Sequence, residues 1–359
     1  MKTMSRYLAL VAAFATGSAQ PAYAAVFCVH DAADLENALA DASNNAQDDV
    51  IRIQRGSYDR ADVSRFAYIA PDDETYDLEI SGDWYGNCAR QGRSSTTTII
   101  DGAGLDYALA IWFPGSFATI RQLTFVGGFA PGQADRGAGL ELLGTGAESG
   151  VVFRVEKNVF IGNEATFGGG LSVAGATIVQ VINNVFAANS AGNDISAAEL
   201  SSSDGAVYFA NNTIVGNAVA SSTVWIYSAL GAYVVNNNFD DNLGDDDLAV
   251  FVPQGENPSN LLRNNNIASW YIPGPLVEED NIDVDPEYES GFLNFTPVRT
   301  SPLVDAGREP GFLEFWFLVD FDINGSPRTV GAHVDIGAFE NEHILVDGFD
   351  PQGPFDIAQ

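Results

Sequence analysis

Apolar residues in this chain occur in short runs that are rich in β-branched and aromatic side chains. Examples lie at residues 151–153, 178–182, 224–227 and 233–235. Gly, Asn, Ser and Asp separate these runs, which show no helical period. Short apolar runs with turn-forming residues on either side are typical of β-strands. The pattern therefore predicts an all-β protein built from many short strands.

A repeated motif, Asn-x-[Phe/Ile]-x-x-Asn, punctuates these strands. Its copies occupy residues 158–163, 184–189, 212–217 and 237–242, with a partial copy at 265–267. The intervals between the four full copies are 26, 28 and 25 residues. A period of this size with only short strands predicts a solenoid, in which each coil stacks on the next at roughly 4.8 Å. We expect a single-stranded, right-handed parallel β-helix over residues 96–290.

The two anchors of the motif have different expected roles. The third position should point inward and stack from coil to coil, and it is occupied by Phe160, Phe186, Ile214 and Phe239. The sixth position should lie at a tight turn, and it is occupied by Asn163, Asn189, Asn217 and Asn242. Asparagine tolerates left-handed backbone, and its amide can bond along an Asn ladder. We therefore assign these anchors to structure rather than to catalysis.

The region before the repeats predicts export and a cap. Residues 1–24 contain two basic residues, an apolar run and Ala22-Tyr23-Ala24, as in a cleavable signal peptide. Residues 25–95 form the expected N-terminal cap, with a short helix over residues 32–42 that covers the open end of the solenoid. In an exported protein, the two cysteines, Cys28 and Cys88, are expected to form a disulfide.

Two segments resemble known bacterial modules. The Phe-x-x-Asn and Gly-Gly-[Ala/Gly]-Leu tetrapeptides of residues 120–245 resemble chlamydial-type polymorphic outer-membrane protein repeats. Residues 301–307, 320–328 and 334–340 resemble, in order, the choice-of-anchor Q domain that closes some secreted bacterial proteins. We expect this closing module over residues 291–343 and a tail over 344–359. Both resemblances imply a β-helix that is extracellular or displayed on a bacterial surface, without implying a reaction.

The charge of the chain narrows the choice of partners. Its 48 acidic and 16 basic residues give a formal net charge of −32. A polyanion lacks the basic surface that phosphate contacts require, which excludes nucleic acid as a partner. No apolar run approaches the length of a membrane-spanning helix. We expect an acidic monomer that has no transmembrane segment and takes a glycan or another cell-surface ligand.

One acidic cluster near the C-terminus is a candidate Ca²⁺ site. Asp320, Asp322 and Asn324 reproduce the first half of an EF-hand-type calcium loop, because Gly325 follows them as the loop requires. The twelfth loop position, which should be glutamate, is Gly331. A turn of the closing module explains the same residues without a metal. We predict no required cofactor and keep Ca²⁺ at this turn as the candidate metal site.

Two functions remain open on the sequence. The first is non-catalytic binding or adhesion, for which Trp225, Tyr227, Tyr233, Trp270 and Tyr271 would stack on sugar rings if they are exposed. The alternative is a polysaccharide lyase or glycoside hydrolase that uses Ca²⁺ and solenoid carboxylates; its candidate residues are Asp240, Asp241, Asp245 and Asp246. The signature tripeptides of polygalacturonases are absent from the chain. We therefore favour binding, with no catalytic residue assigned.

Overall fold

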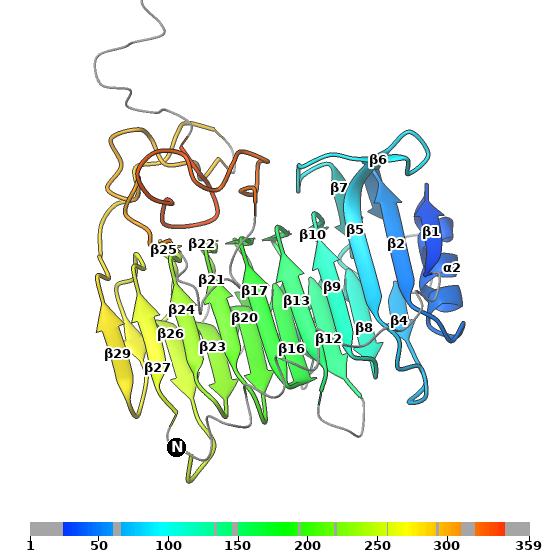
Figure 1. The fold of residues 1–359 in the computed structure, drawn as a ribbon, viewed down its shortest axis with the longest axis horizontal. Coiled ribbons are helices and arrows are strands. Elements are labelled where there is room, and N and C mark those ends of the chain that lie inside the picture. Colours follow the sequence, from blue (N-terminus) through cyan, green and yellow to red (C-terminus); the bar gives the residue numbers. More distant parts are fainter. Residues whose placement is uncertain are drawn as a thin grey trace, which may run out of the picture.

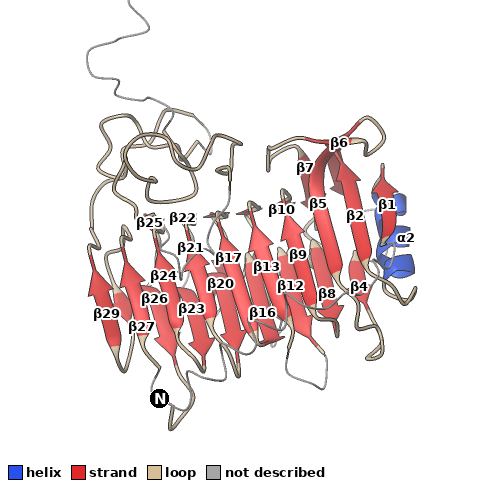
Figure 2. Cartoon of the chain, viewed as in Figure 1, coloured by secondary structure: helices blue, strands red, loops and turns tan. Residues whose placement is uncertain are grey.

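A computed structural model describes residues 24–59, 66–132, 135–145, 150–192, 195–218, 221–256, 258–291, 294–309 and 320–341. The predicted tail and all of the predicted signal peptide except Ala24 lie outside these residues. The described chain is a parallel β-helix with strands stacked along one axis and one helix, α2 (Ala32–Ala42), at the N-terminal end (Figures 1 and 2). The predicted fold class is confirmed.

Three long sheets form the faces of the solenoid, and a short fourth sheet lies at one corner. Sheet A contains β1 (Ala25–Val29), β2 (Asp49–Gln54), β5 (Leu78–Tyr85), β9 (Phe117–Arg121), β13 (Val152–Glu156), β17 (Ile178–Ile182), β21 (Val207–Ala210), β24 (Ala232–Val235), β27 (Asn260–Arg263) and β29 (Leu276–Glu279), with β6 (Arg90–Gln91) antiparallel to β5. Sheet B contains β3 (Gly56–Asp59), β7 (Thr98–Asp101), β10 (Thr124–Val126), β14 (Val159–Ile161), β18 (Val185–Ala187), β22 (Thr213–Val215) and β25 (Asn238–Asp240).

Sheet C contains β4 (Ala67–Ile69), β8 (Leu109–Phe113), β12 (Leu140–Gly144), β16 (Leu171–Ala176), β20 (Ile195–Ser202), β23 (Ser222–Ser228), β26 (Asp246–Phe251) and β28 (Trp270–Tyr271). Sheet D contains β11 (Phe129–Ala130), β15 (Glu164–Ala165) and β19 (Ser190–Ala191), between sheets B and C in the chain. Each coil therefore visits the sheets in the same order, which repeats the same side-chain environments at each level.

The solenoid begins earlier than the predicted boundary at residue 96. Strands β1, β2 and β5 pair in parallel and continue directly into β9 of the same sheet. Residues 25–95 therefore supply coils as well as the helical cap. The repeat motif misses them because these coils lack the Asn anchors and are joined by longer connections. Helix α2 itself matches its prediction, with Asp31 accepting a hydrogen bond from the Asp34 N–H at its N-terminus.

The apolar anchors stack inside the solenoid. Phe125, Phe160, Phe186, Ile214 and Phe239 follow one another in register along sheet B, and each is at most 5% exposed. The rings of Phe160 and Phe186 are parallel, with centroids 4.8 Å apart. This separation equals the stacking distance between coils, so each ring packs on the ring of the next coil.

The sixth-position asparagines form a buried amide ladder. The Nδ2 atoms of Asn163, Asn189 and Asn217 each donate to Oδ1 of the next ladder residue, at 3.0 Å, and Asn242 ends the series. The residue before each anchor, rather than the anchor itself, has the left-handed backbone: Gly162, Ala188, Gly216 and Asp241. The prediction thus placed the left-handed turn one residue too late. The asparagine is needed for its inward amide.

Asparagine doublets at the corner between sheets A and B hold the closing module. The second residue of each doublet forms another inner ladder, through Asn184, Asn212, Asn237 and Asn265, and Asn158, which follows Lys157, continues it. The first residue is left-handed and points outward, as in Asn183, Asn211, Asn236 and Asn264. These outer amides bind Phe321 O, Arg328, Arg308 and Ala306 O. The module accordingly lies over the ends of β22 and β25 (Figure 1).

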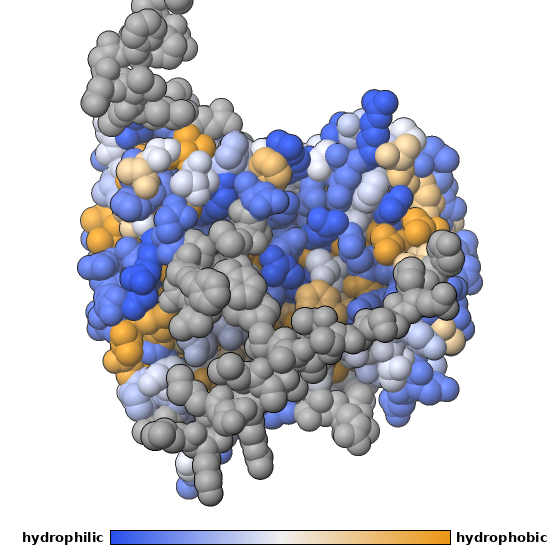
Figure 3. Space-filling model, in the orientation of Figure 1, coloured by the Kyte–Doolittle hydropathy of each residue, from blue (hydrophilic) through white to orange (hydrophobic). Residues whose placement is uncertain are grey.

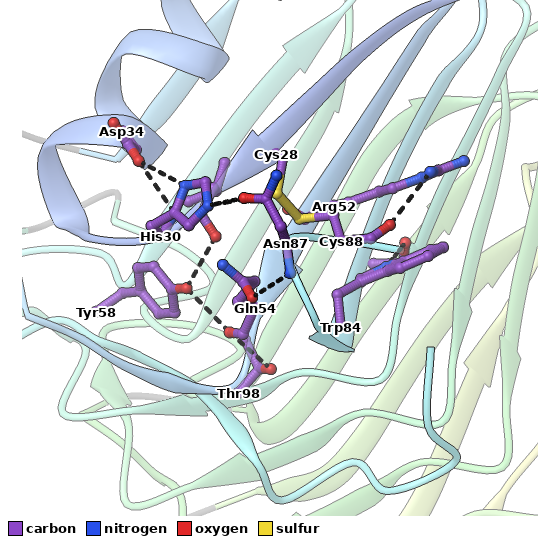
Figure 4. The surroundings of a disulfide bond; sticks show 12 residues. Cys28, His30, Asp34, Arg52, Gln54, Tyr58, Trp84, Asn87, Cys88 and Thr98 are labelled. Carbon is purple, nitrogen blue, oxygen red and sulfur yellow. Dashed lines mark hydrogen bonds and ion pairs between the residues drawn. A yellow bond between two sulfur atoms is a disulfide. The ribbon is translucent and has the colours of Figure 1, made fainter. Parts of the chain in front are cut away.

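The N-terminal coils are crosslinked by the predicted disulfide, which is confirmed between Cys28 and Cys88. It joins β1 to the turn after β5, and the adjacent Asn87 side chain accepts a hydrogen bond from His30 Nε2 at 2.7 Å (Figure 4). The other ring nitrogen of His30 lies 3.1 Å from Asp34 Oδ2. Two acceptors raise the pKa of His30, with the Asn87 contact as the larger cause. The disulfide therefore fixes the turn after β5 against β1, and His30 links that turn to Asp34 of α2.

The C-terminal edge of sheet A carries an inward-pointing charge. Glu278 on β29 is in register with Leu262 of β27, which is fully buried in the core. Glu278 occupies the equivalent inward position but is exposed, because β29 is the last strand of its sheet. Inward charges on edge strands prevent one sheet from pairing with another. This residue is therefore suited to ending the solenoid.

Candidate glycan-binding face

Four aromatic side chains gather on the outer face of sheet C, and we call them the aromatic platform: Trp225, Tyr227, Phe251 and Tyr271. On β23, the buried residues Val224 and Ile226 alternate with Trp225 and Tyr227, which are partly exposed. This alternation follows from the two-residue period of a strand. Tyr271 is half exposed, at 50%. The platform therefore presents ring surface to solvent at the C-terminal end of the sheet.

Contacts between the rings hold the platform together. The Trp225 and Tyr227 rings are nearly parallel, with centroids 6.1 Å apart and planes at 11°. Phe251 lies 5.6 Å from Trp225 and 5.5 Å from Tyr271. The small Ala249 stands between Trp225 and Tyr271 in the strand register, which leaves room for the larger rings on either side. Such mutual packing fixes the rings before any ligand arrives.

The sequence identified only part of this platform. Phe251 was missed, because its run of apolar neighbours reads as core. Trp270 is in register with the buried Leu248 and packs against the core rather than on the platform. Tyr233 lies on sheet A, where it stacks on Tyr208 at 5.0 Å. Membership therefore depends on which sheet and which side of the strand a residue occupies.

A polar strip continues the same outer column along sheet C. Its members, Glu141, Ser172 and Glu199, are adjacent in the strand register, and Glu199 is next to Trp225. Glu199 forms an ion pair with Arg136 and lies 3.5 Å from Ser172 Oγ. Glu141 accepts a hydrogen bond from Trp112 Nε1 at 3.1 Å. Both carboxylates are thus held in place, Glu199 next to the aromatic platform and Glu141 two coils further along the same column.

The aspartates of the alternative enzyme hypothesis occupy different environments. Asp240 is partly buried, and burial, with the charge of Asp241, raises its pKa to about 6. It bonds to Tyr288, whose hydroxyl also accepts a 2.7 Å hydrogen bond from Asn238. Asp241 and Asp245 are exposed, and Asp246 is partly exposed at the start of β26. Within the described ranges, no three His, Cys, Asp or Glu side chains are grouped as metal ligands are.

The candidate calcium turn is occupied by hydrogen bonds of the closing module. Asp322 is fully buried, and its oxygens accept the backbone N–H groups of Asn324, Ser326 and Glu340 at 2.8–3.0 Å. Asp320 lies at the exposed start of the turn. Burial raises the pKa of Asp322. This geometry gives Asp322 a structural role, and Ca²⁺ at the turn stays a prediction.

A buried charge cluster closes the module around Arg328. Its Nη2 donates to Asp335 O at 2.9 Å and Gly337 O at 2.7 Å, and its Nη1 lies 3.3 Å from Glu340 Oε1. Asp335 accepts the N–H groups of Asp305 and Asn341, both at 2.7 Å. Burial raises the pKa of Glu340 to about 8. Arg328, Asp335 and Glu340, which lie in the segments that resemble the choice-of-anchor Q domain, therefore stabilise the fold of the closing module.

The chain shows little similarity to known proteins. No protein-family model matches the chain, and no curated protein matches it. Among solved structures, the chain is similar to the pectin methylesterase from Aspergillus niger, at 12% identity and a TM-score of 0.42, over 73% of this chain and 86% of that one. The two bacterial resemblances noted in the sequence have no family match and stay predictions. None of the helices in the described ranges is long and apolar enough to span a membrane.

Proposed function

We propose that this chain is an exported β-helix protein that binds glycans, without cleaving them, through the aromatic platform of sheet C. The observation that carries the proposal is the set of pre-packed, partly exposed rings of Trp225, Tyr227, Phe251 and Tyr271. Sugar rings have apolar C–H faces that pack on aromatic faces, while their hydroxyl groups require nearby polar partners. The platform and the adjoining polar strip supply both.

The shape of the face favours an extended ligand. Coils stack about 4.8 Å apart, so the column from Glu141 to Tyr271, over six strands of sheet C, extends for roughly 24 Å. A linear polysaccharide lying along the solenoid axis would contact the platform and the strip together. Among the residues coloured in the space-filling view, most of those on the visible face are polar, and the apolar groups are small and separate (Figure 3). A compact aromatic cluster on such a protein is suited to a specific ligand.

Substitution of Tyr271 tests the proposal, because half of this side chain is already exposed. We expect Tyr271→Ala to weaken binding to an insoluble or immobilised glycan about two- to tenfold, as the loss of one aromatic contact implies. Tyr233→Ala, which removes a tyrosine from a stacked pair on sheet A, is the matched control and should bind normally. Equal binding by both variants would show that the platform is not the site.

The same samples separate binding from catalysis. A non-catalytic protein should release no oligosaccharides from a bound polymer during prolonged incubation, measured as soluble reducing ends or unsaturated products. Release that Asp240→Ala or Asp241→Ala abolishes would instead support the enzyme hypothesis. Comparing the secreted and cell-associated fractions of an expressing bacterium tests the predicted export. The N-terminal sequence of the secreted protein tests the predicted cleavage, which should leave Ala25 as the first residue.

A further inference from the structure

The polar strip beside the platform carries information about which glycans fit. We infer that Glu141 and Glu199 make this face selective for uncharged polysaccharides and against polymers that carry carboxylate groups. This inference rests on the proposed function and adds the chemical class of the ligand.

The strip has unused capacity to accept hydrogen bonds. An ionised carboxylate offers about four lone-pair sites, all of them acceptors. Glu141 has one described partner, the Trp112 indole N–H, and its side chain is partly exposed. Sugar hydroxyls can donate to the remaining sites, whereas a carboxylate group of a sugar acid cannot. The strip therefore matches a hydroxyl-rich ligand in its hydrogen bonding.

The charge of the strip favours the same class. Glu141 and Glu199 bring two negative charges, and the neighbouring Arg136 compensates one of them through its ion pair with Glu199. The guanidinium also lies 4.6 Å from the Phe167 ring centroid, so it is engaged on a second side. A ligand carboxylate placed on the strip would meet a net negative charge on a chain whose formal charge is −32. Repulsion between two such charges at about 4 Å would weaken binding about fivefold in water and more where water is excluded.

The register makes it difficult for a ligand to avoid these charges. Glu199 is directly beside Trp225, one coil away, and Glu141 is two coils further along the same column. A chain that stacks on the platform and extends over the next coils must therefore pass over the strip. The selectivity is expected to apply to polymers and long oligosaccharides, and to be weaker for single sugars.

Paired polymers test this inference. Dextran, hydroxyethyl cellulose and laminarin would each be compared with their carboxymethyl derivatives by affinity electrophoresis of the mature protein at low salt. We expect at least one neutral polymer to retard the protein. The affinity for its carboxymethyl form should be lower by a factor of about five or more. The difference should shrink in 0.5 M NaCl, because salt screens exposed charges.

Glu141→Gln keeps the size of the side chain and an oxygen that can accept the Trp112 hydrogen bond, but it removes the charge. It should raise binding to the carboxymethyl polymer relative to the neutral one, while Glu164→Gln, an exposed glutamate on sheet D, should leave the ratio unchanged. Equal binding of neutral and carboxymethyl polymers, or a ratio insensitive to Glu141→Gln, would overturn the inference alone. Failure to bind any polymer would overturn the proposed function, and the inference with it.

Discussion

Replacement of Asn189 by alanine tests the buried amide ladder directly. Asn189 is fully buried, and its Nδ2 donates to Phe160 O and Asn217 Oδ1, both at 3.0 Å. Its Oδ1 accepts from the backbone N–H and the Nδ2 of Asn163, at 3.1 and 3.0 Å. Asn189→Ala removes four hydrogen bonds and takes one partner from each of three neighbouring groups: Phe160 O, the Asn163 backbone N–H and one N–H of the Asn163 amide, whose other N–H still donates to Phe125 O at 3.0 Å.

The size of the effect follows from these three groups. A buried polar group without a partner costs about 1–3 kcal/mol, so Asn189→Ala should lower the free energy of unfolding by about 3–6 kcal/mol, allowing for some relaxation. Asn242→Ala is the matched control at the end of the ladder. Asn242 also accepts two hydrogen bonds from Asn217, but it is partly exposed, so water can replace the lost amide. We expect that control to cost only about 1 kcal/mol.

Guanidinium unfolding followed by circular dichroism and tryptophan fluorescence measures both variants, and free energies are comparable only where the denaturant dependence is unchanged. Asn189→Asp adds a test of the donors, because it keeps the shape of the side chain but would point a carboxylate oxygen at Phe160 O. It should destabilise at neutral pH at least as much as alanine does. Equal losses for the interior and terminal alanine variants, or a well-tolerated aspartate, would refute the reasoning.

Three further outcomes are expected. Replacing Cys28 and Cys88 with serine should lower stability by about 4 kcal/mol, because the disulfide closes a separation of 60 residues; chemical denaturation measures the loss. The pKa of Glu340 is about 8 in the folded protein, so this residue keeps a proton that it releases above about pH 4.5 in the unfolded chain. The free energy of unfolding should therefore fall as pH rises from about 4.5 to 8. Glu340→Gln should flatten the melting-temperature profile over that range. Glu278→Leu should cause self-association in size-exclusion chromatography with light scattering, whereas Glu256→Leu in an exposed loop should not.

The repeat was enough to predict the fold because its anchors perform one structural task at each level. Phe160 and Phe186 stack in the core, and Asn163 and Asn189 bond in the ladder, so spacing alone reveals the coil. The start of the solenoid was less accessible. Strand β2 has the alternating burial of a solenoid strand, but its coil has no Asn anchor to mark the period. Pairing between distant strands determines such coils, and a single sequence does not display it.

The candidate site was harder to predict for a related reason. Trp225 and Tyr227 are two residues apart in sequence, and alternation alone places them on one side of a strand. Phe251 and Tyr271 join them only through the register of neighbouring coils. Glu199 carried no motif that distinguished it from other acids. Its place beside Trp225 follows from pairing of β20 with β23, which depends on the lengths of the loops between them.

The two residues of each Asn doublet have different roles at the corner between sheets A and B. These roles determine which face of the solenoid the closing module covers and which face stays open to a ligand. Asn184 and Asn212 point inward and bond along the solenoid, while Asn183 and Asn211 point outward and hold the closing module. The same corner anchors the module through Thr213, whose hydroxyl accepts the Ala338 N–H at 2.9 Å. Because these contacts place the module along sheets A and B, the platform lies on a different side of the solenoid. The contacts that hold the closing module and the residues that would bind a ligand therefore belong to different parts of the solenoid. Substitutions on the outer face of sheet C should change glycan binding without disturbing the module.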